Sequence, residues 1–290
     1  MKPKPPPDVH RRELLRVLVA GLSRTRPEAA RMLSGDESIF ELVSWTHLFY
    51  SGLRDIAEDL PGIERILAEP EPTAGDIAEI ESPKRRLARL WHLFGDSAPW
   101  LSRFVAHREL FETLIEVRRY LDNESGVGDR IKALLVAALA KARARRERVL
   151  LIGHSLGSVI GYECLNGTGV DGEDSSICSV DVFVTLGSPL ATRFVRMAVT
   201  GADHHGRLRY PPGVRRWLNF SARGELTALH PELAPFVDVR SLPEDGRNVE
   251  DHAEIYNHFR VGGRINPHKS YGYLINAAVA SRIGDWLLAV

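Results

Sequence analysis

The sequence has few of the features that mark secreted, membrane-spanning or metal-bound proteins. Its 290 residues include two cysteines, Cys164 and Cys178, and no Cys-x-x-Cys pair. Secreted scaffolds use more cysteines, so we expect two reduced thiols. Residues 1–8 are rich in lysine and proline and lack the apolar segment of a signal peptide, and no run of about 18 apolar residues predicts a membrane span. We therefore expect a cytoplasmic protein without stable membrane insertion.

The charge balance and the missing motifs exclude further classes. Lysine plus arginine and aspartate plus glutamate both number 38, so a zero formal charge favours neither nucleic acid nor an anionic membrane as partner. No glycine-rich phosphate loop follows a strand, which argues against a nucleotide-binding protein. The adjacent His204 and His205 do not converge well on one ion. We expect no cofactor and no metal.

Apolar runs alternate with helical patterns over much of the chain. We expect strands at 39–45, 149–152, 180–186 and 214–220, and helices at 9–22, 104–122, 129–147, 156–166 and over the last 20 residues. The run at 149–152 is apolar throughout, which is typical of a strand buried on both faces of a parallel sheet. This alternation predicts an α/β fold with a mostly parallel, doubly wound sheet in one domain of 290 residues.

A Gly-His-Ser-Leu-Gly motif lies directly between a predicted strand and a predicted helix. It runs from Gly153 through His154, Ser155 and Leu156 to Gly157. In this setting the motif predicts a strained turn that lifts the serine hydroxyl clear of the sheet, with glycines where side chains would collide. Ser155 is therefore the predicted nucleophile, and the Leu156 N–H is the predicted donor to a developing oxyanion.

These residues resemble the bacterial lipase/esterase-like α/β-hydrolases. Residues 149–165, VLLIGHSLGSVIGYECL, are similar to that family's nucleophile strand, elbow and helix, and 182–190, VFVTLGSPL, to its next strand and turn. The resemblance begins near Phe40 and is densest over 149–190 and 264–287. It implies the α/β-hydrolase fold, with a triad in the chain order serine, acid, histidine.

A late histidine is needed as the base that activates the serine. His268 lies in Asn-Pro-His-Lys-Ser-Tyr just before the final helix, a segment that resembles the family's histidine loop. We therefore expect His268 to be the base. His252 and His258 are less favoured alternatives, because they lie in a charged stretch before that loop.

The acid of the triad is left open between two residues. Family members often carry Trp-x-Asn on a strand and an aspartate six residues after the asparagine. Here the Trp-Leu-Asn at 217–219 is followed at that distance by Glu225, which is our first expectation. Glutamate can fill this position in the fold. Asp238, which follows an apolar pair, is the alternative.

The start of the chain departs from the family pattern, because no His-Gly pair is present there. Either 16–23 is the usual first strand with Ala-Gly in place of His-Gly, or 9–22 is a helix and the strand is absent. We favour the helix, since Leu14, Leu18 and Leu22 have helical spacing. The absent strand would remove one oxyanion donor, at a cost of roughly 3–4 kcal/mol in the transition state.

Residues 54–103 form a proline-broken helical stretch that predicts an insertion. It is either a lid whose apolar residues at 90–101 line an acyl pocket, or a helical layer that packs on the core.

The sequence thus predicts a serine hydrolase that cleaves carboxylic esters through an acyl-serine intermediate. The expected partner is a small acyl substrate of unspecified chain length, and a homo-oligomer is left open. The alternative is an inactive hydrolase scaffold that binds an acyl ligand or a protein.

Overall fold

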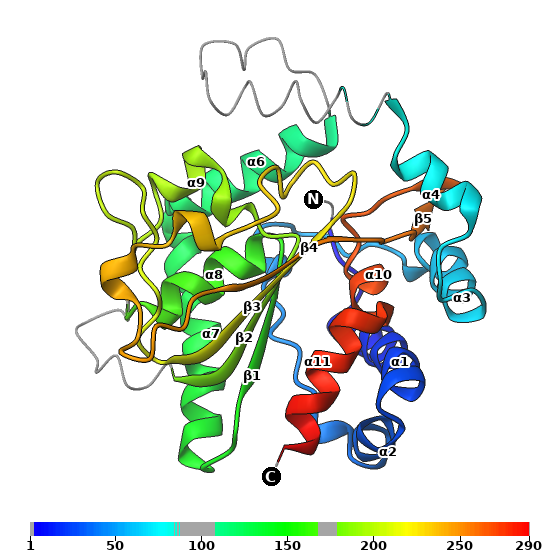
Figure 1. Cartoon of the computed structure of the whole chain (residues 1–290), viewed down its shortest axis with the longest axis horizontal. Helices are drawn as coiled ribbons and strands as arrows, with labels where there is room; N and C mark the ends of the chain where they lie inside the picture. The colour runs from blue at the N-terminus through cyan, green and yellow to red at the C-terminus, as the bar shows by residue number, and fades with distance from the viewer. Residues whose placement is uncertain (1–2, 84, 86, 88–107, 168–178, 290) are drawn as a thin grey trace. The chain divides into compact units, whose positions relative to one another are not determined.

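The computed structural model describes residues 3–83, 85, 87, 108–167 and 179–289 (Figure 1). The chain divides into two units. The first takes in residues 87–221 and 225–254, and the second takes in 2–86, 222–224 and 255–290. Each unit is described by itself.

The first unit holds a four-stranded sheet with the strand order β1-β2-β3-β4. Its strands are β1 (Leu150–His154), β2 (Val180–Leu186), β3 (Val214–Ala222) and β4 (Glu250–Ile255), the last residues of β3 and β4 reaching the second unit. β1 pairs in parallel with β2, with Ile152 opposite Val184, and β2 pairs in parallel with β3, with Phe183 opposite Trp217. The chain is therefore a mixed α/β protein built on parallel strands, as the apolar runs predict.

Three helices of the first unit form one layer on this sheet (Figure 1). They are α6 (Arg108–Leu121), α7 (Val127–Ala144) and α8 (Leu156–Leu165). The helix predicted at 129–147 corresponds to α7, in which Ile131, Leu135 and Leu139 are buried and Leu134 is 37% exposed. α8 approaches β2 closely, since a Cβ on Gly161 would lie 2.9 Å from the Phe183 ring. The first unit also contains the short α9 (Arg193–Arg196).

The position of β1 in the sheet corrects one expectation. Within the described residues, β1 has β2 as its sole neighbour and is an edge strand. Leu150, Leu151 and Ile152 are accordingly half-buried, whereas five consecutive residues of β2, 182–186, are buried. The apolar run at 149–152 predicted full burial, and this was wrong because a sheet edge leaves one side of the strand uncovered.

The second unit is mainly helical. Its helices are α1 (Pro7–Thr25), α2 (Pro27–Gly35), α3 (Leu60–Ala68), α4 (Ala74–Ile80), α10 (Ser270–Ile275) and α11 (Ala277–Leu288). α1 begins at a proline, whose fixed φ and missing N–H suit the first helical position. Its leucines at 14, 15, 18 and 22 are buried, and α1 packs against α2, α10 and α11.

Gly21 permits the close packing of α1, since a Cβ there would lie 2.8 Å from the Leu274 carbonyl oxygen. The helical interpretation of the start of the chain is therefore confirmed, and the alternative strand at 16–23 is wrong. Two other element predictions also fail. Residues 40–45 have no regular structure, and the final helix is broken at Asn276, whose side chain caps α11 by accepting from the Ala278 N–H.

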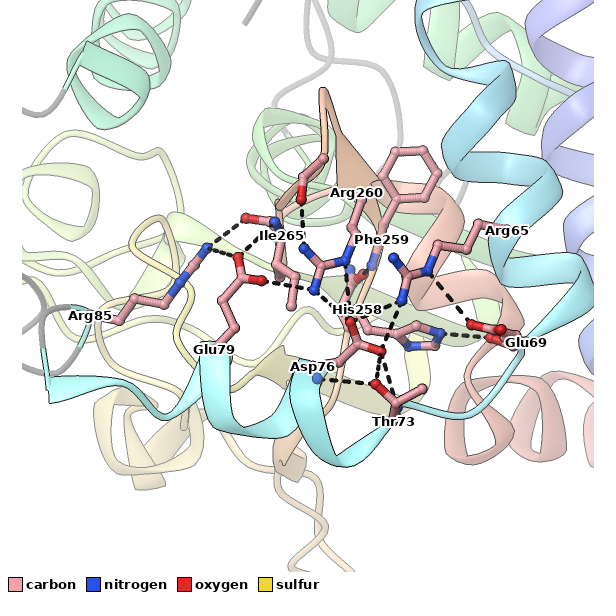
Figure 2. Close-up of polar contacts among 12 residues, drawn as sticks. Arg65, Glu69, Thr73, Asp76, Glu79, Arg85, His258, Phe259, Arg260 and Ile265 are labelled. Atoms are coloured by element: carbon pink, nitrogen blue, oxygen red, sulfur yellow. Dashed lines mark hydrogen bonds and ion pairs between the residues drawn. The ribbon is translucent and has the colours of Figure 1, made fainter.

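A buried ionic cluster fixes the small hairpin β5 (Arg260–Val261) and β6 (Arg264–Ile265) to α3 and α4 (Figure 2). The fully buried Asp76 carboxylate accepts from Arg260 at 2.7 Å and from Arg65 at 3.3 Å. It also completes a capping box with Thr73 at the start of α4. Burial opposes the charge of Asp76, but the hydrogen bonds from Arg260 and Thr73 outweigh it and lower its pKa to about 2.

The predicted insertion at 54–103 is described only in part. Of this stretch, α3 and α4 belong to the second unit, where Ile63, Ile66 and Ile80 are buried. These residues are part of a packed layer. The apolar residues at 90–101 lie outside the described residues, and a lid over an acyl pocket stays a prediction. Among the described helices, none combines the length and the apolar character needed to cross a membrane.

Candidate active site

Ser155 lies in the sharp turn between β1 and α8, in the first unit. Its φ of 55° and ψ of −126° lie in a region that non-glycine residues rarely adopt. Such strain persists only where the surroundings hold it, and it gathers at functional sites. Here the Ser155 N–H donates to the Leu186 carbonyl at the end of β2 at 3.0 Å. The Ser155 side chain does not cap α8, so its hydroxyl is not used to complete the helix.

The two glycines of the motif differ in what they do. A Cβ on Gly153 would lie 2.6 Å from the Ser158 Cα and 2.8 Å from the Gly157 carbonyl oxygen, so the strand and helix leave no room for a side chain. Apart from the backbone of its own helix, a Cβ on Gly157 would have no heavy atom of the described residues within 4 Å. The expectation that both glycines avoid a collision therefore holds for Gly153 and is wrong for Gly157.

Two further serines support the elbow. The Ser158 hydroxyl donates to the Ser155 carbonyl at 2.5 Å and lies 2.7 Å from the Ser188 hydroxyl. Ser188 follows β2 and caps the next short helix by accepting from the Leu190 N–H. All three serines are buried, with at most 2% of each exposed. Sequence analysis missed Ser158 and Ser188, although the Gly-Ser-Pro turn after β2 marked the place.

A chain of polar side chains crosses the sheet from β2 through β3 to β4. Thr185 of β2 donates to Asn219 of β3 at 2.9 Å and accepts from the Trp217 indole at 3.2 Å. Asn219 in turn donates to Asp251 of β4 at 2.8 Å, and Asp251 accepts from the Leu233 N–H. Asn219 and Asp251 thus hold the loop after β3 against the sheet.

The two candidate acids lie in different surroundings. Glu225 follows β3 and is 1% exposed. Asp238 accepts from Arg240 at 2.8 Å and from the Arg240 N–H at 3.1 Å, and the Arg240 hydrogen bonds lower its pKa. Asp238 is thus engaged with a neighbour two residues along the chain. Sequence analysis did not consider Asp251.

His268 lies in the second unit, in the loop between β6 and α10. Its N–H donates to the Asn266 side chain at 3.1 Å. The next residue, Lys269, extends its ammonium into the unit, where it donates to the buried Asp59 at 2.8 Å. Burial lowers the pKa of Lys269, although the Asp59 carboxylate favours its charge. The loop that carries His268 is therefore anchored by the residue beside it.

The other histidines named from the sequence lie elsewhere. His252 is on β4, stacked on Phe220 at 4.6 Å, and His258 bonds to the Glu69 carbonyl at 2.8 Å in the second unit. His204 and His205 have ring centroids 3.8 Å apart. Within the ranges that the structure covers, no three or more histidines, cysteines or carboxylates are grouped to hold a metal ion.

Comparison with known proteins adds no family to this description. No protein-family model matches the chain, and no curated protein or solved structure shows significant similarity to it. The residues around Ser155 and His268 are therefore the basis for a function.

Proposed function

We propose that the chain is a serine hydrolase of the α/β-hydrolase type that cleaves carboxylic esters. The observation that carries this proposal is the backbone of Ser155, with a φ of 55° between a parallel strand and a helix. Ser125 also has a positive φ, 54°, but its ψ of 28° lies in the ordinary left-handed region, whereas the ψ of −126° at Ser155 does not. Strain at a strand-to-helix turn is the setting in which a serine nucleophile works.

The reaction uses the ordered set of residues expected from the sequence. Ser155 Oγ attacks the acyl carbon while His268 takes its proton and passes it to the leaving alcohol. Glu225 orients the imidazole and stabilises its cationic form. The Leu156 N–H, at the positive end of α8, stabilises the oxyanion. Water, activated by His268, then hydrolyses the acyl-serine and releases the acid.

The mechanism uses Ser155, Glu225 and His268 together, so each must be needed for activity. The test is labelling with a fluorophosphonate probe, together with hydrolysis of short p-nitrophenyl esters. We expect labelling of the native protein and none of Ser155→Ala. His268→Gln should slow labelling at least a hundredfold. Ser23→Ala, which removes an exposed hydroxyl on α1, is the matched control and should label like the native chain.

A comparison of two variants tests which residue is the acid of the triad. Glu225→Gln should lower kcat strongly, whereas Asp238→Asn should change it little, since Asp238 is paired with Arg240. The reverse result would move the acid role to Asp238. We propose a small acyl ester as substrate, no cofactor, and a cytoplasmic site of action.

A second candidate is a hydrolase scaffold that binds an acyl ligand without turnover. It is favoured by the edge position of β1 in the described sheet, because the family's preceding strand carries the loop with a second oxyanion donor. A folded native protein that the probe fails to label would support this candidate and overturn the first.

A further inference from the structure

Asn257 holds the peptide groups on both sides of His268. Its side-chain Nδ2 donates to the Pro267 carbonyl at 2.7 Å and to the Lys269 carbonyl at 2.9 Å. Both Nδ2 hydrogens are therefore used on the two residues that flank the predicted base. Its Oδ1 accepts from the Phe259 N–H at 3.2 Å, so the amide is fully satisfied.

The surroundings of Asn257 leave the amide no second position. Asn257 is 0% exposed. A Cβ on Gly272, in the first turn of α10, would overlap the Asn257 Oδ1, so the helix makes room for the amide by having a glycine there. The loop is also closed on itself, because the Asn266 N–H donates to the Phe259 carbonyl at 2.7 Å.

We propose that Asn257 is the positioning residue for His268. A buried amide that bonds two carbonyls in fixed directions sets the path of the backbone between them, and thereby sets where the imidazole of His268 points. A general base must lie within hydrogen-bond reach of the hydroxyl that it deprotonates, and a displacement of about 1 Å costs on the order of a hundredfold in rate. This inference rests on the proposed function, because it takes His268 as the general base that activates Ser155.

The alternative is that Asn257 serves stability alone, and a buried leucine of the second unit is the control for that. Leu33 is 2% exposed and lies on α2, which packs against α1 and α11. Leu33→Ala leaves a cavity there and should lower stability. Because the change removes no hydrogen bond of Asn257, it should leave the imidazole in place.

The experiment compares Asn257→Leu, which keeps the size and removes the donors, with Leu33→Ala. We expect Asn257→Leu to lower kcat and the rate of probe labelling by about ten- to a hundredfold, with KM changed less than about threefold. Leu33→Ala should keep kcat within twofold of the native value. If Asn257→Leu does not fold, Asn257→Ala takes its place, with the same expected effect on kcat.

A second measurement does not need activity. In protein labelled with ¹⁵N-histidine, the His268 signals are assigned by their loss in His268→Gln. They should shift or broaden in the Asn257 variant and stay in place in Leu33→Ala. A kcat within twofold of native for a folded Asn257 variant, or unmoved His268 signals, would overturn the inference. Absent labelling of the native protein would instead overturn the proposed function, and the His268 signals would still decide the role of Asn257.

Discussion

Replacing each glycine of the elbow with alanine tests the geometry of the turn directly. At Gly153 the new methyl would meet backbone atoms of Gly157 and Ser158 at 2.6–2.8 Å, which cannot rotate away as a side chain can. Overpacking of this kind costs about 1–3 kcal/mol, and the immobile backbone places Gly153→Ala at the upper end. At Gly157 the methyl meets nothing within 4 Å inside a helix, where alanine is favoured over glycine by about 0.5–1 kcal/mol.

The two variants should therefore change the free energy of unfolding in opposite directions, and urea unfolding followed by fluorescence and circular dichroism measures both. Gly153→Ala lowers the midpoint, while Gly157→Ala leaves it unchanged or raises it. Each kcal/mol corresponds to about 2–4 °C in Tm for a chain of roughly this size. Equal destabilisation by the two alanines would refute the reasoning, because it would mean that the space around Gly157 is as crowded as that around Gly153.

Three further outcomes are expected. The half-buried His10 has its pKa lowered to about 3, chiefly by burial and then by the charge of Lys4. Below about pH 6.5, His10 is therefore protonated in the unfolded chain but stays neutral in the folded chain. The free energy of unfolding should then fall from pH 6.5 towards pH 3 by up to about 1.4 kcal/mol per pH unit. His10→Leu should flatten this slope in urea titrations. Ser155→Gly should have a free energy of unfolding about 1 kcal/mol or more above that of Ser155→Ala, because glycine adopts the positive φ without strain. Equal urea midpoints for the two variants would argue against strain. Tyr120→Phe removes the 2.7 Å hydrogen bond to the buried Glu163 and should cost about 1.5–3 kcal/mol, measured by thermal unfolding.

The sequence pattern identified the elements in which apolar residues follow a regular spacing or an unbroken run. The stripe of α1 and the apolar run of β2 were predicted because the spacing of apolar residues follows directly from burial. β4 was missed, since its sequence Glu-Asp-His-Ala-Glu-Ile carries little apolar surface and its Asp251 is used internally on Asn219. The strand expected at 39–45 failed for the opposite reason, because β-prone residues form a strand only where a partner strand is available.

The candidate site also has one part that the sequence predicts and one part that it does not. The strand-turn-helix around Ser155 is local and could be predicted, and the structure has β1, the turn and α8 in that order. The roles of Ser158 and Asn257 could not be predicted, because both side chains bond to backbone carbonyls, and every residue type has a backbone carbonyl. Whether Ser155, Glu225 and His268 act together stays a prediction for the labelling experiment.

The packing of the second unit has a consequence for its synthesis. Part of the apolar face of α1 is covered by α10 and α11, which are made long after α1. About 250 residues separate α1 from α10, so at roughly 5–20 residues per second this part of α1 stays uncovered for some 12–50 s. A truncation before residue 270 would leave it uncovered permanently.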